Sequence, residues 1–283
     1  MKGIGVVPNW QKENTAAVTR QIEDFFGSRR IPLLVAGSKE TSIYGQAPLH
    51  ETLAHWAGRV DLIIVVGGDG TILRVARELF RWEVPILGIN VGTKGFLAEI
   101  EVDSMDRYLR LLVEGDYHCS ERILLQAALR RKGEVLGSYT ALNDIVISRG
   151  PLSRIIRLET YINDNFLESY RGDGMIVASP TGSTGYSLSA GGPIVNPSLD
   201  LLLINPICPH SLYSRAVITT GGDEIMLRNR SGKAQAVLTV DGQVGFVLED
   251  RDEVVVRRAE KRVKLVRFAD SSFYTLLHQK LKS

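Results

Sequence analysis

A run of five large apolar residues that leads straight into a glycine-rich segment constrains the fold of this chain more than any other feature. Residues 62–66 read Leu-Ile-Ile-Val-Val, and residues 67–71 read Gly-Gly-Asp-Gly-Thr. Apolar side chains then recur with helical spacing over residues 72–79. The pattern predicts a buried strand, a tight loop and a helix start. In an open α/β sheet such a loop lies at the edge where ligands bind, and the helix start favours phosphate.

The first 120 residues alternate short apolar runs with helical patterns. The apolar runs are rich in Ile, Val and Leu, as expected of parallel strands that helices cover on both faces; they fall at residues 3–7, 31–36, 62–66 and 84–89. Helical spacing is found at residues 18–26, 71–80 and 104–114. Residues 1–120 are therefore expected to form an open, doubly wound α/β domain.

From about residue 122 the pattern changes to alternation of apolar and polar residues. It is clearest at residues 156–162, which precede the turn sequence Asn163, Asp164 and Asn165. Similar strand patterns occur at residues 139–148, 234–240, 253–257 and 262–268. We expect residues 121–268 to form a mainly antiparallel, β-sandwich-like domain. The helical spacing of Phe273, Leu276, Leu277 and Leu281 predicts that residues 269–283 form a helix packing back on the first domain.

Composition narrows the class of protein. Thirty-four basic and thirty-two acidic residues give a net charge of +2, which is too small to argue for a nucleic-acid or membrane partner, and we expect neither. No stretch approaches the roughly 20 apolar residues that span a bilayer. The two cysteines, Cys119 and Cys208, lack the short spacing of a zinc or redox site, so we expect buried thiols and a cytoplasmic location.

Asp69 lies in the middle of the glycine-rich loop. A carboxylate among phosphate-binding amides repels a phosphate unless it serves a hydroxyl group or a metal ion, so Asp69 is a candidate catalytic base or magnesium carrier. The alternative is that Asp69 only caps the helix. Neither G-x-x-x-x-G-K-[ST] nor G-x-G-x-x-G is present, which weakens a P-loop kinase and a Rossmann dehydrogenase.

Four polar clusters interrupt the strand patterns of the second half. They are Asn143-Asp144, residues 171–174 (RGDG), residues 179–193 (SPTGSTGYSLSAGGP) and residues 240–243 (VDGQ). The long cluster combines flexible glycines, hydroxyl groups and one aromatic ring, which suits the sugar, phosphates and base of a nucleotide. Each cluster taken alone is also compatible with a surface loop.

Taken together with the GGDGT loop, these clusters resemble the NAD kinase family, bacterial ATP/polyphosphate type, over most of the chain. The resemblance implies transfer of the terminal phosphoryl group of ATP, or of another donor, to the 2′-hydroxyl of the adenosine ribose of NAD, giving NADP. It also implies that Asp69 is the catalytic base and that the donor-phosphate loop consists of Gly67, Gly68, Gly70 and Thr71.

The resemblance further implies the residues that bind NAD. Asn143 and Asp144 would hold the ribose and adenine, although the family usually has Glu where this chain has the shorter Asp144. Asp173 would lie near the nicotinamide amide, and Tyr186 would stack on a base. Arg154, whose alternative is an exposed strand residue, would meet a phosphate. The full implied set is Asp69, Gly70, Arg74, Asn143, Asp144, Arg154, Arg171, Asp173, Thr184, Gly185, Tyr186, Ser187, Leu188, Ser189 and Gln243.

The implied cofactor is a divalent cation, Mg²⁺, that arrives with the donor rather than at a fixed protein site. The implied partners are NAD, ATP or polyphosphate, and further copies of this chain in a homodimer or homotetramer. Two rival functions are a diacylglycerol- or sphingoid-type lipid kinase that shares the GGDGT loop and a non-catalytic NADP-binding sensor. The serine-rich cluster argues against the first and an intact Asp69 against the second. The main interpretation expects Asp69 and the serine-rich cluster to act on one coenzyme.

Overall fold

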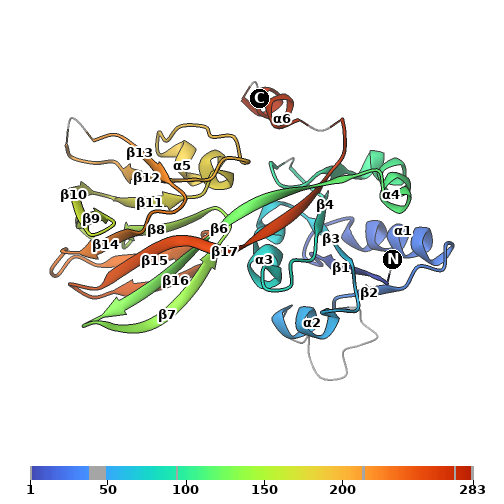
Figure 1. The fold of residues 1–283 in the computed structure, drawn as a ribbon, viewed down its shortest axis with the longest axis horizontal. Helices are drawn as coiled ribbons and strands as arrows, with labels where there is room; N and C mark the ends of the chain where they lie inside the picture. Colours follow the sequence, from blue (N-terminus) through green and yellow to red (C-terminus); the bar gives the residue numbers. More distant parts are fainter. Residues whose placement is uncertain (1, 38–48, 94, 212–213, 271, 282–283) are drawn as a thin grey trace. The chain divides into compact units, whose positions relative to one another are not determined.

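The computed structural model describes residues 2–37, 49–93, 95–211, 214–270 and 272–281 (Figure 1). The chain divides into two compact units. Unit 1 comprises Met1–Glu121 and Arg262–Ser283, and unit 2 comprises Arg122–Lys261. Two long strands, β6 (His118–Arg131) and β17 (Glu253–Arg267), begin in one unit and end in the other. The end of β17 therefore belongs to unit 1, whereas the sequence pattern assigned it to the β-rich domain.

Unit 1 is built on a parallel sheet in the order β2-β1-β3-β4, with β5 and the end of β17 also pairing with β4. Its strands are β1 (Ile4–Pro8), β2 (Leu33–Val35), β3 (Leu62–Gly67), β4 (Ile86–Asn90) and β5 (Ile100–Glu101). The strands β1, β3 and β4 are buried throughout, as their continuous apolar runs predicted. The edge strand β2 is only half-buried and shorter than predicted.

Helices cover both faces of this sheet. On one face α1 (Thr15–Gly27) and α4 (Met105–Glu114) contribute Phe26, Leu109 and their neighbours to a shared core. On the other face lie α2 (Leu49–Trp56) and α3 (Asp69–Leu79), because Gly5 packs against Trp56 and Gly88 against Ile72. The doubly wound α/β fold is confirmed. Helix α2, which the sequence analysis missed, supplies part of the second layer.

The C-terminal helix α6 (Phe273–Leu281) belongs to unit 1. Its Lys280 ammonium lies 5.7 Å from the ring centroid of Phe96. Just before it, Asp270 accepts hydrogen bonds from Arg107 (3.0 Å) and Tyr108 (2.9 Å) of α4. These contacts hold the end of the chain on unit 1, as the helical spacing led us to expect.

Unit 2 consists of two antiparallel layers. One layer has the order β13-β12-β11-β8-β15-β16, and the other contains β10-β9-β14-β17 with β6 beside β17 and β7 beside β6. The strands are β7 (Glu134–Ala141), β8 (Asp144–Arg149), β9 (Ile156–Ile162), β10 (Asn165–Gly172), β11 (Gly174–Ala178), β12 (Leu201–Ile207), β13 (Val217–Thr220), β14 (Ile225–Asn229), β15 (Ala236–Val240) and β16 (Val244–Leu248). The sandwich-like domain predicted from alternation is confirmed.

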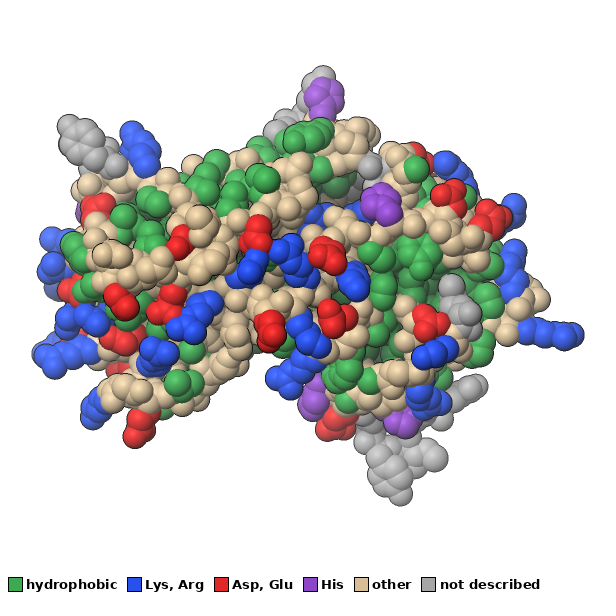
Figure 2. Space-filling model, viewed as in Figure 1, with side chains coloured by type: hydrophobic (Ala, Val, Ile, Leu, Met, Phe, Trp, Pro, Cys, Tyr) green, Lys and Arg blue, Asp and Glu red, His purple; other side chains and the backbone are tan. Residues whose placement is uncertain are grey.

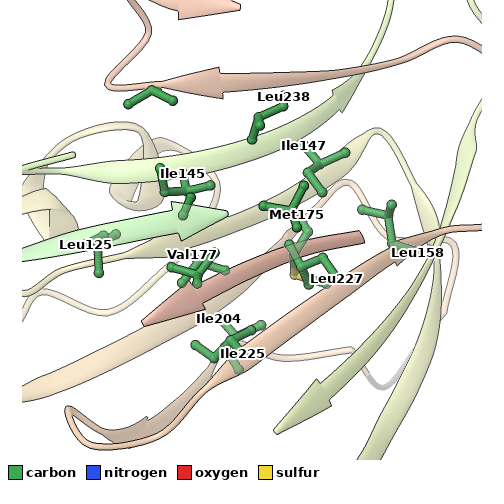
Figure 3. Close-up of a cluster of buried hydrophobic side chains, with 14 of the residues drawn as sticks. Leu125, Ile145, Ile147, Leu158, Met175, Val177, Ile204, Ile225, Leu227 and Leu238 are labelled. Atoms are coloured by element: carbon green, nitrogen blue, oxygen red, sulfur yellow. The ribbon is translucent and has the colours of Figure 1, made fainter. Parts of the chain in front are cut away.

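A hydrophobic core lies between these layers. Ile147 and Met175 come from one layer and Leu158 and Leu227 from the other, and all four are at most 1% exposed. Figure 3 shows their side chains pointing toward one another. Every second residue of β9 faces the core, and alternation in the sequence predicted that strand, whereas β11 and β14 were not predicted.

The β9–β10 hairpin forms as predicted, because Asn163 and Asp164 adopt the positive φ angles (49° and 63°) that a two-residue turn requires. Two other strand predictions were wrong in extent. Residues 139–148 belong to two strands, β7 and β8, that lie in different layers. Residues 253–268 contain one continuous strand, β17, instead of two.

The surface carries charges of both signs. On the face shown in Figure 2, Lys and Arg side chains are interspersed with Asp and Glu side chains, in keeping with a net charge of +2. Both cysteines are exposed, so the prediction of buried thiols was wrong. Cys119 lies near the start of β6 and Cys208 directly follows β12, outside the covered stretches of these strands. No helix in the described part of the chain is long and apolar enough to cross a membrane.

Candidate active site

The glycine-rich loop connects β3 to α3 at the carboxyl edge of the sheet of unit 1. The hydroxyl of Thr71, which is 6% exposed, accepts a hydrogen bond from Asn9 Nδ2 at 3.1 Å. A Cβ atom on Gly67 would lie only 2.6 Å from that hydroxyl oxygen. Gly67 is therefore required by packing inside the loop, in addition to any approach of a phosphate.

Asp69 is the first residue of α3, and its carboxylate turns toward a different loop. It accepts backbone N–H groups from Phe96 (2.7 Å), Leu97 (3.1 Å) and Ala98 (3.4 Å). The N-cap residue is Gly68, and no side chain of a described residue caps the helix. The alternative that Asp69 is only a helix cap is therefore wrong. A carboxylate offers about four lone-pair positions, so three amides leave room for one more donor.

Arg74 lies farther along α3. Its side chain is exposed and, among the described residues, forms no hydrogen bond or ion pair. The structure thus leaves Arg74 available to a ligand but does not bring it to the residues that hold Asp69.

In unit 2, Asn143 and Asp144 lie at the corner between β7 and β8. The carboxylate of Asp241 accepts the backbone N–H groups of Leu142 (3.0 Å), Asn143 (2.8 Å) and Asp144 (3.1 Å), which fixes this corner. Asp144 is 5% exposed. Burial, and secondly the nearby charge of Asp241, raise the pKa of Asp144 to about 7.

The serine-rich cluster packs against this corner. Ser179 donates its hydroxyl to the carbonyl oxygen of Leu142 at 2.5 Å, and a Cβ atom on Gly182 would lie 2.2 Å from the carbonyl oxygen of Asn143. One on Gly185 would lie 3.5 Å from Asn143 Nδ2 and 3.9 Å from Asp144 Oδ2. The clusters predicted separately at residues 143–144 and 179–193 are therefore brought together within unit 2.

The six residues of the predicted wrapping segment differ in accessibility. Tyr186 is 46% exposed, which leaves a ring face open for stacking. Ser187 is fully buried, and its oxygens accept from Asn205 Nδ2 at 2.9 and 3.4 Å. The structure therefore places Ser187 as a support of the segment. Thr184, Gly185 and Leu188 are half-buried and Ser189 is exposed.

Asp173 lies close to the same cluster. Burial first, then the charges of Cys208, Asp173 and Asp144, raise the pKa of Tyr186, so these groups lie within electrostatic range of its hydroxyl. The carboxylate of Asp173 is held by Arg149, whose Nε lies 2.6 Å from Oδ1. Arg149 was not predicted from the sequence, because an Arg at the end of a strand carries no local signal of its distant partner.

The remaining predicted ligands lie at the surface of unit 2. Arg171 is exposed on β10, and Arg154 is exposed in the loop before β9 and not in a strand. Neither forms a side-chain hydrogen bond or ion pair within the described part of the chain. Gln243 is exposed in the β15–β16 turn, where Asp241 and Gly242 adopt positive φ angles of 48° and 64°.

Two buried polar atoms near the 143–144 corner have no hydrogen-bond partner among the residues that the structure describes. They are Asn143 Oδ1 and Thr181 Oγ1. Buried polar atoms are normally satisfied, so unsatisfied ones beside a polar cluster point to a ligand or water with matching groups. An amide oxygen and a hydroxyl suit the hydroxyl groups of a sugar.

The α/β unit carries an acid-bearing loop at its ligand-binding edge, and the β unit carries polar clusters that suit a sugar and a base. These features are those of a two-domain, nucleotide-binding phosphotransferase. Residues 4–117 match the family of the ATP-NAD kinase N-terminal domain, and residues 142–268 match that of the ATP-NAD kinase C-terminal domain. The chain belongs to the NAD kinase family.

Curated relatives and solved structures agree with this assignment. An NAD kinase of Natranaerobius thermophilus is 42% identical over 99% of this chain and 98% of its own length. Yeast NADH kinase, solved in complex with NADH, has a TM-score of 0.88 at 25% identity and matches 99% of this chain and 87% of its own. An NAD kinase from Archaeoglobus fulgidus, solved with ATP, has a TM-score of 0.76 at 26% identity over 99% of this chain and 98% of its own.

Proposed function

We propose that this chain transfers the terminal phosphoryl group of ATP, or of another phosphoryl donor, to the 2′-hydroxyl of the adenosine ribose of NAD, which yields NADP. The observation that carries the proposal is the gathering of Asn143, Asp144, Gly185 and Tyr186 in unit 2. This cluster offers acceptors for ribose hydroxyls, a close backbone approach and an open aromatic face. Membership of the NAD kinase family sets the lipid-kinase alternative aside.

Asp69 is the proposed general base. Its carboxylate is oriented by the amides of residues 96–98, and its remaining lone pair accepts the proton of the 2′-hydroxyl as the oxygen attacks the terminal phosphorus. The bond from that phosphorus to the donor's bridging oxygen breaks, and the donor leaves as ADP when it is ATP. Backbone amides at the start of α3 stabilise the negative charge that develops.

The NAD contacts follow the cluster in unit 2. Asn143 and Asp144 bind the ribose and adenine, Asp173 binds near the nicotinamide amide, and Tyr186 stacks on a base. The rest of the serine-rich segment wraps the dinucleotide through Thr184, Gly185, Leu188 and Ser189. The buried Ser187 supports these residues. The remaining proposed NAD contacts are Gly70, Arg74, Arg154, Arg171 and Gln243. The loop that binds the donor phosphates consists of Gly67, Gly68, Gly70 and Thr71.

A divalent cation, Mg²⁺, arrives with the donor and neutralises charge on its phosphates. The described residues hold no group of three or more His, Cys, Asp or Glu side chains that could bind a metal alone. The cation would be held by the donor phosphates, which leaves the remaining lone pair of the Asp69 carboxylate for the 2′-hydroxyl. We further propose a cytoplasmic homodimer or homotetramer.

The test is direct. Purified protein is incubated with NAD, ATP and MgCl₂, and NADP is read with an NADP-specific coupled dehydrogenase; polyphosphate replaces ATP in a second arm. NADP formation in either arm supports the proposal. Absence of NADP, combined with tight NADP binding by calorimetry, would instead identify the non-catalytic sensor.

A further inference from the structure

The strand order of unit 1 places a loop that has no assigned role, residues 9–14, next to the donor loop. The connection from β1 leads outward to β2, and the connection from β2 returns past β1 to β3. The direction in which the chain adds successive strands to the sheet thus reverses between β1 and β3. In open α/β sheets ligands bind at such a reversal, beyond the carboxyl ends of its two strands. The two loops there are residues 67–71 after β3 and residues 9–14 after β1.

The loop after β1 is fastened to the donor loop. The backbone amide of Asn9 donates to the carbonyl oxygen of Val66 at 2.8 Å, and its side chain donates to the Thr71 hydroxyl at 3.1 Å. The amide of Lys12 in turn donates to the carbonyl oxygen of Asn9 at 3.0 Å. The backbone of Lys12 is therefore positioned by the same residues that shape the donor loop.

The ammonium group of Lys12 lies between two glycines. A Cβ atom on Gly68 would lie 2.9 Å from Lys12 Nζ, and one on Gly92 would lie 2.8 Å from it. Any larger residue at either position would displace this ammonium. The buried amide of Asn90, which is 2% exposed, donates to the carbonyl oxygen of Gly92 and to the carboxylate of Glu101. Its own Oδ1 has no hydrogen-bond partner among the described residues. An unsatisfied buried polar atom thus belongs to the residue that holds Gly92, one of the two glycines beside Lys12.

No described residue pairs with the charge of Lys12. Its side chain is half-buried and makes no hydrogen bond or ion pair with any described residue. It also lies beside the start of α3, where the helix dipole is positive and disfavours a cation. The nearby carboxylate of Asp69 is bonded to the amides of residues 96–98. An anion that binds between the Lys12 ammonium and the N-terminus of α3 would stabilise both positive charges.

We propose that Lys12 binds phosphate oxygens of the phosphoryl donor, acting with the amides at the start of α3 as one polyanion site. The identity of the donor rests on the proposed function, whereas the phosphate chemistry rests on the geometry of unit 1. The shared ligand chemistry is a chain of linked phosphates, as found in a nucleoside triphosphate and in inorganic triphosphate. Lys12 then supplies the fixed positive charge that the absent P-loop lysine supplies in other kinases.

The test compares Lys12→Met, Lys12→Arg and the matched control Lys233→Met, which removes an exposed lysine of unit 2. In steady-state assays Lys12→Met should raise KM for ATP about tenfold to a hundredfold, the value of a charge-assisted hydrogen bond, while KM for NAD changes less than about twofold. Lys12→Arg should restore much of the donor affinity, and Lys233→Met should match the wild type.

Two further measurements separate binding from structure. Without donor, the melting temperature of Lys12→Met should equal or exceed that of the wild type, because a cation leaves the positive end of α3; a purely structural role would lower it. Calorimetry without NAD should show weaker binding of both ATP and inorganic triphosphate to Lys12→Met. Weakening for ATP alone would overturn the proposal, because Lys12 would then recognise the nucleoside.

The outcome for Lys12 can be separated from the outcome for the activity. If the wild type makes no NADP but binds inorganic triphosphate, and Lys12→Met binds it less tightly, the proposed function fails and the phosphate site stands. If the wild type and Lys12→Met bind triphosphate equally, or the wild type does not bind it at all, the phosphate site is refuted whatever the activity.

Discussion

The guanidinium Nε of Arg149 lies 2.6 Å from Oδ1 of Asp173, and the two residues are also joined by a backbone hydrogen bond of 2.8 Å. A second guanidinium nitrogen donates to the carbonyl oxygen of Ser153 at 3.2 Å. Arg149 ends β8 and Asp173 separates β10 from β11, so the pair ties the end of one strand to a proposed NAD ligand. Arg149 is thereby a positioning residue for Asp173.

Replacing Arg149 by Met should therefore release the Asp173 carboxylate. Both side chains are about one-third exposed, so the loss of unfolding free energy should be modest, about 1–2 kcal/mol. KM for NAD should rise more than KM for ATP. Urea denaturation and steady-state kinetics measure the two effects, with the exposed α1 variant Arg20→Met as the control. An unchanged KM for NAD would contradict the positioning role.

Asp69→Asn should remove most turnover, by a factor of about 10² to 10⁴, because an amide cannot accept the proton of the 2′-hydroxyl. The structure adds a second effect. An Asn side chain has one acceptor oxygen, and its NH₂ group would face an amide of residues 96–98, so stability should fall by about 1–2 kcal/mol. Calorimetric NAD affinity should remain within a few-fold of the wild type. Near-normal NADP production would refute the catalytic assignment.

Asp144 should make stability depend on pH in a direction unusual for a carboxylate. Its pKa is raised from 3.8 to about 7, so the folded state binds a proton that the unfolded state releases. The stabilisation is fully present below about pH 4 and is lost at roughly 1.4 kcal/mol per pH unit up to about pH 7. Urea denaturation of the wild type and Asp144→Asn should show the wild type losing stability relative to the variant over this range. A constant difference from pH 5 to pH 8 would rule out the raised pKa.

Gly182→Ala should displace the serine-rich cluster from the 143–144 corner. Its Cβ atom would lie 2.2 Å from the carbonyl oxygen of Asn143, a backbone atom that cannot move independently. We expect a loss of about 1–3 kcal/mol in stability and at least tenfold weaker NAD binding by calorimetry. Gly27→Ala is the matched control, since its Cβ atom would meet nothing within 4 Å. Equal NAD affinity in the two variants would show that the corner and the cluster do not act together.

The sequence by itself determined the class of each half of the chain. Continuous apolar runs mark strands covered on both faces, and alternation marks strands with one buried face, so the α/β and sandwich-like folds followed from local periodicity. The hairpin at Asn163 and Asp164 followed from turn chemistry. The family motifs also lie in continuous segments, which is why the resemblance could be seen without coordinates.

Only the tertiary structure decided the partners of the polar side chains. The amides that hold the carboxylate of Asp69 lie 27 to 29 positions away, and those that hold Asp241 lie 97 to 99 positions away. The raised pKa of Asp144, the Arg149–Asp173 pair and the place of Lys12 between two glycines depend likewise on distant segments. Periodicity records how a residue relates to its neighbours along the chain. Hydrogen bonds and charge interactions depend on distances in space, which folding alone establishes.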